Sequence, residues 1–161
     1  MQLRPANPQD SEALARIYNE EVLGSTVTLD LVPRTIAEQR AWVARHAGAH
    51  PAIVAVEKEN VAGFAALSPY RQRPAYSTTV EDSVYVASDH RGQGVGGMLL
   101  ERLVELGTAH GFHAAIARCS SENVASVALH RSCGFTVVGI EREVGRKFGK
   151  WVDIMVMERM L

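Results

Sequence analysis

The sequence predicts an α/β fold in which a mixed β-sheet is covered by helices. Short apolar runs of β type alternate along the chain with amphipathic segments of helical period. The chain has 161 residues, of which 47% are hydrophobic and 22% are charged. That length and composition suit one globular domain with a core large enough for such a sheet. We therefore expect residues 1–161 to form a single domain.

The chain begins with a short strand and two helices. Residues 2–5 have the pattern of a strand, and the Asn-Pro pair at 7–8 supplies a cap and a first-turn proline for a helix. Apolar side chains then recur at helical spacing until Gly24, which ends that helix. Thr35 can cap a second helix over residues 36–46. This opening therefore predicts a β-α-α order.

The middle of the chain is rich in strands. Residues 52–56 and 61–67 are apolar β-type runs joined by a turn at 57–60, which indicates a hairpin. A loop rich in arginine and proline follows. Residues 77–86 then form a longer predicted strand, whose successive side chains alternate between its two faces.

The last third returns to alternating helices and strands. A glycine-rich turn at 91–97 opens an amphipathic helix, which Gly111 ends. The remaining predicted elements are, in order, a strand over 114–117, a helix over 123–131, and strands over 135–140 and 151–157.

Charge and cysteine content narrow the possible partners. There are 17 basic and 18 acidic side chains, so a general attraction to nucleic acid or to a membrane surface is not expected. No apolar run has the length of a signal peptide or a membrane span, which favours a cytoplasmic location. Cys119 and Cys133 lack metal-ligand spacing and form no CxxC motif. We expect reduced thiols and no metal.

The turn from Arg91 to Gly97, RGQGVGG, follows a strand and opens a helix. Unpaired N–H groups at a helix N-terminus bind phosphate, and glycines let the backbone approach it closely. A Walker A loop is excluded because no lysine precedes a serine or threonine here. Gly92, Gly94 and Gly97 fit the G-x-G-x-x-G fingerprint of dinucleotide binding. The acidic residue that should bind the ribose is missing, because Glu122 lies at a helix start and not at a strand end. A tight turn without a ligand remains an alternative.

A second polar cluster lies on the helix over 123–131. Asn123, Ser126 and His130 are spaced i, i+3 and i+7, so they project from one helical face. Singly, they could be a helix cap, a serine bonded back to a carbonyl, and a half-buried histidine. Together they form a polar stripe on one helical face, which indicates a functional surface.

These two helices carry a family resemblance. The motif consists, in chain order, of Arg91-x-x-Gly94-x-Gly96, Asn123-x-x-Ser126-x-x-Leu129-His130 and Gly134-Phe135. It resembles the GNAT superfamily of acetyltransferases. Residues 79–86 (TVEDSVYV) and 144–151 (VGRKFGKW) resemble the phosphinothricin and methionine sulfoximine N-acetyltransferases within it. The resemblance implies a mostly antiparallel sheet flanked by helices, acetyl-CoA as co-substrate, a small amino-acid-like amine as acceptor, and a homodimer.

The resemblance also implies which residues hold acetyl-CoA. The backbone of one strand and the glycine-rich turn would bind it, with help from the second polar helix. An N–H at the strand end, that of Val86, would polarise the thioester carbonyl. The implied cofactor-binding residues are Val84, Tyr85, Val86, Arg91, Gly92, Gln93, Gly94, Val95, Gly96, Gly97, Asn123 and Ser126.

Two side chains are candidates for proton transfer. An amino-acid ammonium must lose a proton before it can attack, and Glu81 lies in the strand beside the acetyl donor. It could act directly or through water. His130 stands where many relatives have a tyrosine, and it can protonate the departing CoA thiolate. Tyr85 is the alternative donor.

The acceptor site is expected to be cationic. Arg71 and Arg73 could bind carboxylate, phosphinate or sulfone oxygens, because a guanidinium suits bidentate contacts. The predicted substrate-binding residues are Arg71, Gln72, Arg73, Glu81, Asp82, Ser83, Lys147 and Phe148. Two other functions stay open: a CoA-binding regulatory module without turnover, and an N-acetyltransferase for proteins or peptides.

Overall fold

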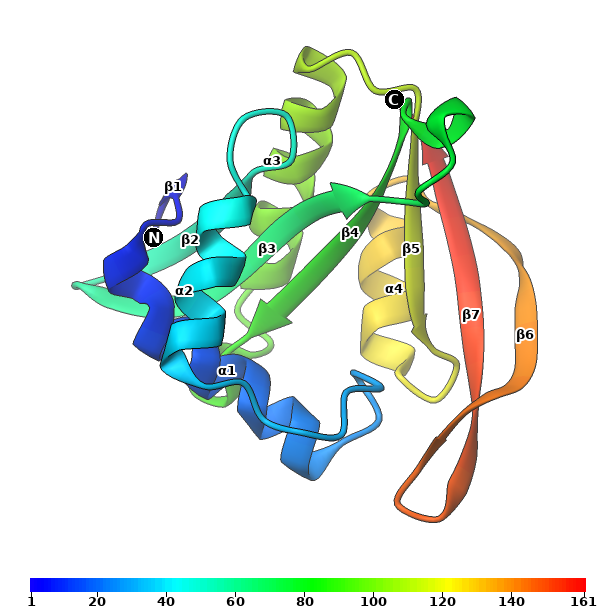
Figure 1. Cartoon of the computed structure of the whole chain (residues 1–161), viewed down its shortest axis with the longest axis horizontal. Helices are drawn as coiled ribbons and strands as arrows, with labels where there is room; N and C mark the ends of the chain where they lie inside the picture. The colour runs from blue at the N-terminus through cyan, green and yellow to red at the C-terminus, as the bar shows by residue number, and fades with distance from the viewer.

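The computed structural model describes residues 1–161 and contains a seven-stranded sheet flanked by helices (Figure 1). The strands are β1 (Gln2–Pro5), β2 (Ala52–Glu57), β3 (Asn60–Pro69), β4 (Thr79–Val86), β5 (Ala114–Ser120), β6 (Thr136–Lys147) and β7 (Lys150–Met160). The α-helices are α1 (Ser11–Gly24), α2 (Ile36–Arg45), α3 (Val95–Ala109) and α4 (Val124–Ser132). Short 3-10 helices cover Pro8–Asp10, Pro74–Tyr76 and Ser88–His90. No helix is both long and apolar enough to cross a membrane.

The sheet is mixed and mostly antiparallel, as predicted. Its strand order is β1-β2-β3-β4-β5-β7-β6. Every neighbouring pair is antiparallel except β4 and β5, which run parallel. The crossover between these two strands contains α3, which is the usual way to connect parallel neighbours.

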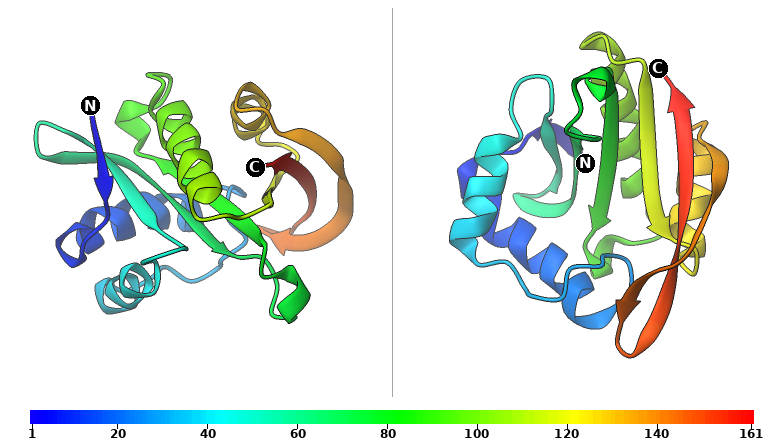
Figure 2. Two further views of the ribbon diagram at one scale, coloured as in Figure 1. Left: turned by 90° about the horizontal axis from the view of Figure 1, so that it is seen from above. Right: turned by 45° about the vertical axis from the view of Figure 1, so that its right-hand side comes forward.

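Helices cover both faces of the sheet (Figure 2). On one face α1 and α2 pack over a cluster that includes Leu14, Ile17 and Phe64. On the other face α3 and α4 bury a larger apolar cluster, to which α3 contributes Leu99 and Leu103. Both clusters are nearly free of solvent exposure, so the central strands are fixed from both sides.

The C-terminal strands are longer than predicted. Residues 141–147 and 150 belong to a β6–β7 hairpin, whereas the sequence pattern ended one strand at 140 and began the next at 151. The turn residues Phe148 and Gly149 both have positive φ, as a tight hairpin requires. The pairing register shifts between Glu141 and Gly145, and most of β6 is exposed. That irregularity removes the alternation from which a strand is predicted.

The pairing of β4 and β5 stops early and opens the sheet. Thr79–Glu81 pair with Ala114–Ile116, and beyond them the two strands diverge, as Figure 1 shows. On its other edge β4 stays paired with β3 as far as Val86. From Asp82 onward the edge of β4 that faces β5 therefore has no strand partner. This V-shaped gap positions the candidate site.

Candidate active site

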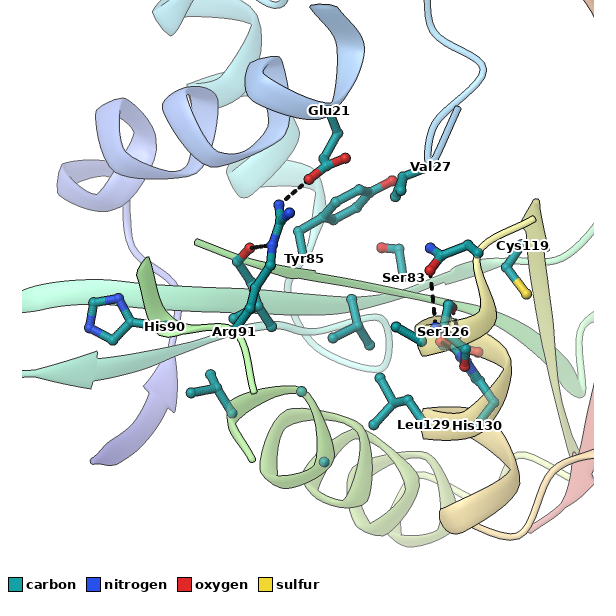
Figure 3. Close-up of a pocket in the computed structure, with 18 of the residues that line it drawn as sticks. Glu21, Val27, Ser83, Tyr85, His90, Arg91, Cys119, Ser126, Leu129 and His130 are labelled. Carbon is teal, nitrogen blue, oxygen red and sulfur yellow. Dashed lines mark hydrogen bonds and ion pairs between the residues drawn. The ribbon is translucent and has the colours of Figure 1, made fainter. Parts of the chain in front are cut away.

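A cavity of about 450 Å³ lies where β4 and β5 diverge. Its walls come from β4, β5, the N-terminal turn of α3, the polar face of α4 and the C-terminal end of α1 (Figure 3). Every residue predicted to hold the cofactor lines it except Gln93, whose side chain bonds the Asp89 carbonyl oxygen. Glu81, Asp82 and Ser83 of the predicted substrate set line it as well.

The N-terminus of α3 forms an open backbone cradle. Gly92 and Gly94 have φ of +73° and +81°, which other residues adopt only with strain. A Cβ at Gly94 or Gly97 would meet no atom within 4 Å, so nothing covers the backbone there. The first N–H groups of a helix lack partners inside the helix and carry the positive end of its dipole. The cradle therefore fits a phosphate or pyrophosphate group.

Gly96 has a packing role that the motif alone did not reveal. A Cβ at this position would lie 3.2 Å from Leu129 of α4 and 3.7 Å from Val86 of β4. The first distance is tighter than most carbon contacts, so the Leu129 side chain would have to shift by a few tenths of an ångström. The glycine thus allows α3 and α4 to pack closely at the wall of the cavity.

Arg91 is paired within the protein. Its guanidinium bonds the carboxylate of Glu21 on α1, and its Nε donates to the Val86 carbonyl oxygen at 3.3 Å (Figure 3). Glu21 is buried and lines the cavity. No local motif points to this partner, because the two residues lie 70 positions apart. With Arg91 neutralised by Glu21, anion binding depends mainly on the α3 backbone.

Glu81 is half-buried at the point where β4 and β5 separate. Burial raises the pKa of its carboxyl group, and the nearby positive charge of Arg118 opposes this rise. A carboxylate with a raised pKa is a stronger base than an exposed one. The position and the pKa of Glu81 therefore suit a proton acceptor inside the cavity.

Arg118 is a site residue that the sequence analysis missed. It extends from β5 into the cavity and forms a bidentate pair with Glu141 of β6, with N···O distances of 2.8 and 2.5 Å. This pair holds the guanidinium in a fixed orientation near Glu81. The available signal was an arginine within the otherwise apolar stretch AAIARC.

His130 lies on the other side of the cleft from Glu81, on α4. It is 5% exposed, and both ring nitrogens have protein partners: the Ser126 carbonyl oxygen at 2.7 Å and Asp82 at 2.9 Å. Asn123 caps α4, because its side chain accepts from the Ser126 N–H at 3.1 Å. Burial disfavours the charged imidazole, but the bond and charge of Asp82 outweigh it and raise the pKa of His130.

Tyr85 points to the opposite face of β4. Its ring stacks on Phe64 at 5.2 Å and meets Tyr18 edge-on at 5.1 Å. In Figure 3 it extends toward Val27, away from His130. Burial raises the pKa of its phenol. The two candidate proton donors are therefore separated by the strand.

The remaining predicted substrate residues lie outside the cavity lining. Arg71, Gln72 and Arg73 are exposed in the loop before β4, where the guanidinium of Arg71 lies 4.8 Å from the ring of Tyr70. Phe148 is 59% exposed at the hairpin turn. Lys147 is 2% exposed, and its ammonium donates to the carbonyl oxygens of Thr28 and Glu21 at 2.8 and 3.3 Å. Its donors thus face backbone carbonyl oxygens at the C-terminal end of α1 and in the segment that follows.

Residues 12–135 match the acetyltransferase (GNAT) family. The chain is 39% identical to the phosphinothricin N-acetyltransferase of Streptomyces coelicolor, in an alignment that covers 100% of this chain and 96% of that relative. It is 37% identical to the L-methionine sulfoximine/L-methionine sulfone acetyltransferase of Pseudomonas paraeruginosa, over 97% of this chain and 92% of that one.

Solved structures show the same likeness. A GNAT superfamily phosphinothricin acetyltransferase from Sinorhizobium meliloti, solved in complex with acetyl-CoA, superimposes with a TM-score of 0.96 and is 37% identical. The superposition covers 99% of this chain and 88% of that chain. The chain therefore belongs to the GNAT acetyltransferase family. It is an acetyl-CoA-dependent N-acetyltransferase, as the glycine-rich turn and the polar face of α4 predicted.

Proposed function

We propose that this enzyme acetylates the amino group of a small amino-acid-like molecule that carries acidic or sulfone-type oxygens, as phosphinothricin, methionine sulfoximine and methionine sulfone do. The observation that carries the proposal is the half-buried Glu81 beside the cationic Arg118 in the cleft between β4 and β5. The names of the relatives support the same substrate class. We also propose that residues 1–161 act as one domain.

The cofactor half of the cleft fits acetyl-CoA, which supplies an activated acetyl thioester. The open backbone at Gly94 and Gly97 suits the pyrophosphate. The unpaired edge of β4 after Glu81 offers backbone groups to an extended pantetheine arm, much as a strand partner would bond there. We assign the N–H of Val86 to the thioester carbonyl oxygen, where negative charge develops during attack.

Glu81 is assigned as the general base. An amino-acid ammonium carries no free lone pair, so a proton must leave before nitrogen can attack. A carboxylate in the cleft can accept that proton directly or through one water molecule. The amine then attacks the thioester carbon in a ternary complex, without a covalent acetyl-enzyme, because the thioester is already activated. The two buried cysteines are consistent with this, since burial raises the pKa of both thiols.

His130 is assigned as the proton donor to the departing CoA thiolate. It lines the cavity on the α4 side, and Asp82 raises the pKa of its ring, which favours the protonated form. Tyr85 is the poorer donor, because it projects from the other face of β4 and packs against Phe64. The two faces of β4 would thus serve the two proton transfers separately.

Arg118 is proposed to bind the anionic or sulfone oxygens of the acceptor, and Arg71 to attract them at the entrance. Arg118 lines the cavity and its orientation is fixed by Glu141, whereas Arg71 is exposed. A fixed guanidinium loses little freedom on binding an anion. The charge of Arg71 acts to lower the pKa of Glu81, which supports a position of Arg71 near the cleft.

The substrate class is tested by thiol release from acetyl-CoA with a panel of amines. We expect the highest kcat/KM with phosphinothricin, methionine sulfoximine or methionine sulfone, lower values with simple aliphatic amines, and the lowest with peptides. Initial rates at varied concentrations of both substrates should give intersecting lines, as a ternary mechanism requires. Faster turnover of peptides would favour a protein acetyltransferase, and binding without turnover would favour a regulatory module.

We also propose that the enzyme is a homodimer, with the β6–β7 hairpin in the interface. Val144, Phe148 and Trp151 are all more than half exposed on this hairpin. Neighbouring apolar side chains left in water are typical of a surface that binds another protein. Sedimentation of the purified protein should give twice the chain mass, and Trp151→Lys should shift it toward a monomer. A wild-type monomer at micromolar concentration would contradict this.

A further inference from the structure

The hydrogen bonds of His130 define how many protons it holds. Its Nδ1 lies 2.7 Å from the Ser126 carbonyl oxygen, which can only accept, so Nδ1 carries a hydrogen. Its Nε2 lies 2.9 Å from Oδ2 of Asp82. If Nε2 were unprotonated, its lone pair would face a carboxylate lone pair at hydrogen-bond distance. One further proton must therefore lie between Nε2 and Oδ2.

The surroundings of the pair contain no other charged contact. The side chains of His130 and Asp82 are 6% and 2% exposed. From α4 itself the imidazole meets Ser126, and the ring of Phe135 lies edge-on with its centroid 5.1 Å away. The other titratable groups near Asp82 are the carboxyl group of Glu81, which precedes it in β4, and the thiols of Cys119 on β5 and Cys133 after α4. Burial raises the pKa of each thiol, so both are neutral at neutral pH.

Asp82 itself depends on His130. Its second oxygen, Oδ1, is buried and has no hydrogen-bond partner in the protein. The imidazole is therefore the group that compensates this carboxylate, and a buried ion pair is most costly when one partner is lost. Asp82 therefore favours the protonated, charged form of His130.

We propose that Asp82 is a positioning residue that keeps a second proton on His130, so that the Asp82–His130 pair stores the proton that the departing thiolate receives. This rests on the proposed function of the cleft. Successive residues of a strand point to opposite faces, so Glu81 and Asp82 serve opposite sides of the reaction. The base lies on one face of β4, and the partner of the proton donor lies on the other.

The proton balance closes over one cycle. The proton leaves through Nδ1, because Nε2 faces Asp82. The N–H bond of Nδ1 breaks as its hydrogen passes to Oγ of Ser126, 3.3 Å away, and the hydroxyl hydrogen of Ser126 forms the S–H bond of CoA. A neutral imidazole remains, with its Nε2–H still bonded to Asp82. The acceptor ammonium gives up two protons on its way to the amide, the first to Glu81. Exchange with solvent returns one of them to His130 and releases the other. Asp82 makes the return favourable because a neutral imidazole no longer compensates the charge of the buried carboxylate.

The proposal is tested without turnover by NMR titration of the imidazole of His130, assigned with a His130→Asn variant. Asp82→Asn preserves the shape and removes the charge. We expect the titration midpoint of His130 to fall by roughly one to three pH units, as for the loss of an opposite charge in contact. Asp82→Glu should restore most of the shift. The matched control is Asp89→Asn, which removes the carboxylate that contacts His90 and should leave His130 unchanged.

A second readout separates positioning from general destabilisation. In Asp82→Asn the alkaline limb of the kcat profile should move to lower pH by the same amount as the NMR midpoint. At alkaline pH, kcat of the variant should be lower than kcat of the wild type by about tenfold for each pH unit by which the midpoint has moved. The Kd of acetyl-CoA should stay the same. An unchanged midpoint, or a loss of kcat that is equal at every pH, would overturn the proposal. If Asp82→Asn does not fold, Asp82→Ser provides the same comparison. Absence of turnover in the wild type would contradict the proposed function and leave the NMR result interpretable.

Discussion

The two halves of the cleft are built by different means. The cofactor half consists of backbone, namely the open turn at Gly92–Gly97 and the unpaired edge of β4. The acceptor half consists of side chains that come together from distant segments, such as Glu81, Arg118 and Glu141. Backbone groups bind any ligand of the right shape and charge, whereas side chains select an acceptor. We therefore expect binding of acetyl-CoA and choice of amine to respond to different substitutions.

The largest effect is expected for Glu81→Gln. Loss of a general base should lower kcat/KM by about 10²–10⁴-fold. The wild-type profile should rise with pH through the raised pKa of Glu81, since the carboxylate is the active form. The deficit of the variant should shrink at high pH, where free amine is abundant. A deficit that stays the same at every pH would demote Glu81 to a binding residue.

A smaller effect is expected in the backbone half, for Gly97→Glu. Gly97 lines the cavity, and its Cβ position is open and needs no positive φ. A carboxylate there should repel the pyrophosphate and raise the Kd of acetyl-CoA roughly tenfold, a loss of about 1.4 kcal/mol in binding free energy. Gly97→Gln is the control of equal size and should bind much more tightly than Gly97→Glu. Equal Kd values for the two variants would contradict the anion assignment. Gly94 is a poorer site for this test, because its φ of +81° strains any side chain.

The next effect concerns acceptor selection. Arg118→Gln should raise KM for acid-bearing amines several-fold to roughly tenfold and leave KM for simple amines nearly unchanged. It should also move the acid limb of kcat/KM to higher pH, because the charge of Arg118 lowers the pKa of Glu81 in the wild type. Arg71→Ala should raise KM less, since Arg71 is exposed, and Arg73→Ala is the matched control. A larger rise in KM for Arg71→Ala than for Arg118→Gln would mean that Arg71, and not Arg118, binds the oxygens of the acceptor.

The smallest effect on turnover is expected at Lys147. Its ammonium bonds one carbonyl oxygen near the C-terminal end of α1 and one in the segment that follows, so it ties the β6–β7 hairpin to that part of the chain. Lys147→Met should lower the free energy of unfolding by about 1–3 kcal/mol, the usual cost of losing charged hydrogen bonds that leave buried carbonyls unpaired. The midpoint of denaturant unfolding measures this. A large loss of kcat/KM with unchanged stability would instead support the substrate contact expected from the sequence.

Most of the fold could be predicted from the sequence, because the core obeys simple periodicity. The helices around Leu14 and Leu103 and the strand around Val80 bury one face or both, and their patterns show it. The β6–β7 hairpin does not show this periodic burial. β6 is a mostly exposed edge strand with shifted register near Glu141, so its residues do not alternate between core and solvent.

The candidate site was predictable where it depends on local sequence. The glycine-rich turn, Glu81 and His130 could be proposed because each lies in a short motif, and all of them line the cavity. Side-chain pairs between distant segments could not. Asp82 and His130 are 48 positions apart, and Arg118 and Glu141 are 23 apart. Such contacts depend on the order of strands in the sheet, which local patterns do not encode.

The separation of the two halves is tested most directly by measuring the Kd of acetyl-CoA and kcat/KM for the acceptor on the same two proteins, Glu81→Gln and Gly97→Glu. Isothermal titration gives the first quantity, and thiol release gives the second. We predict that Glu81→Gln loses turnover by at least about 10²-fold at neutral pH with an unchanged Kd. Gly97→Glu should raise the Kd of acetyl-CoA and nearly retain kcat when acetyl-CoA is saturating. A Glu81→Gln protein that folds but no longer binds acetyl-CoA would contradict the division of the cleft into a backbone half and a side-chain half.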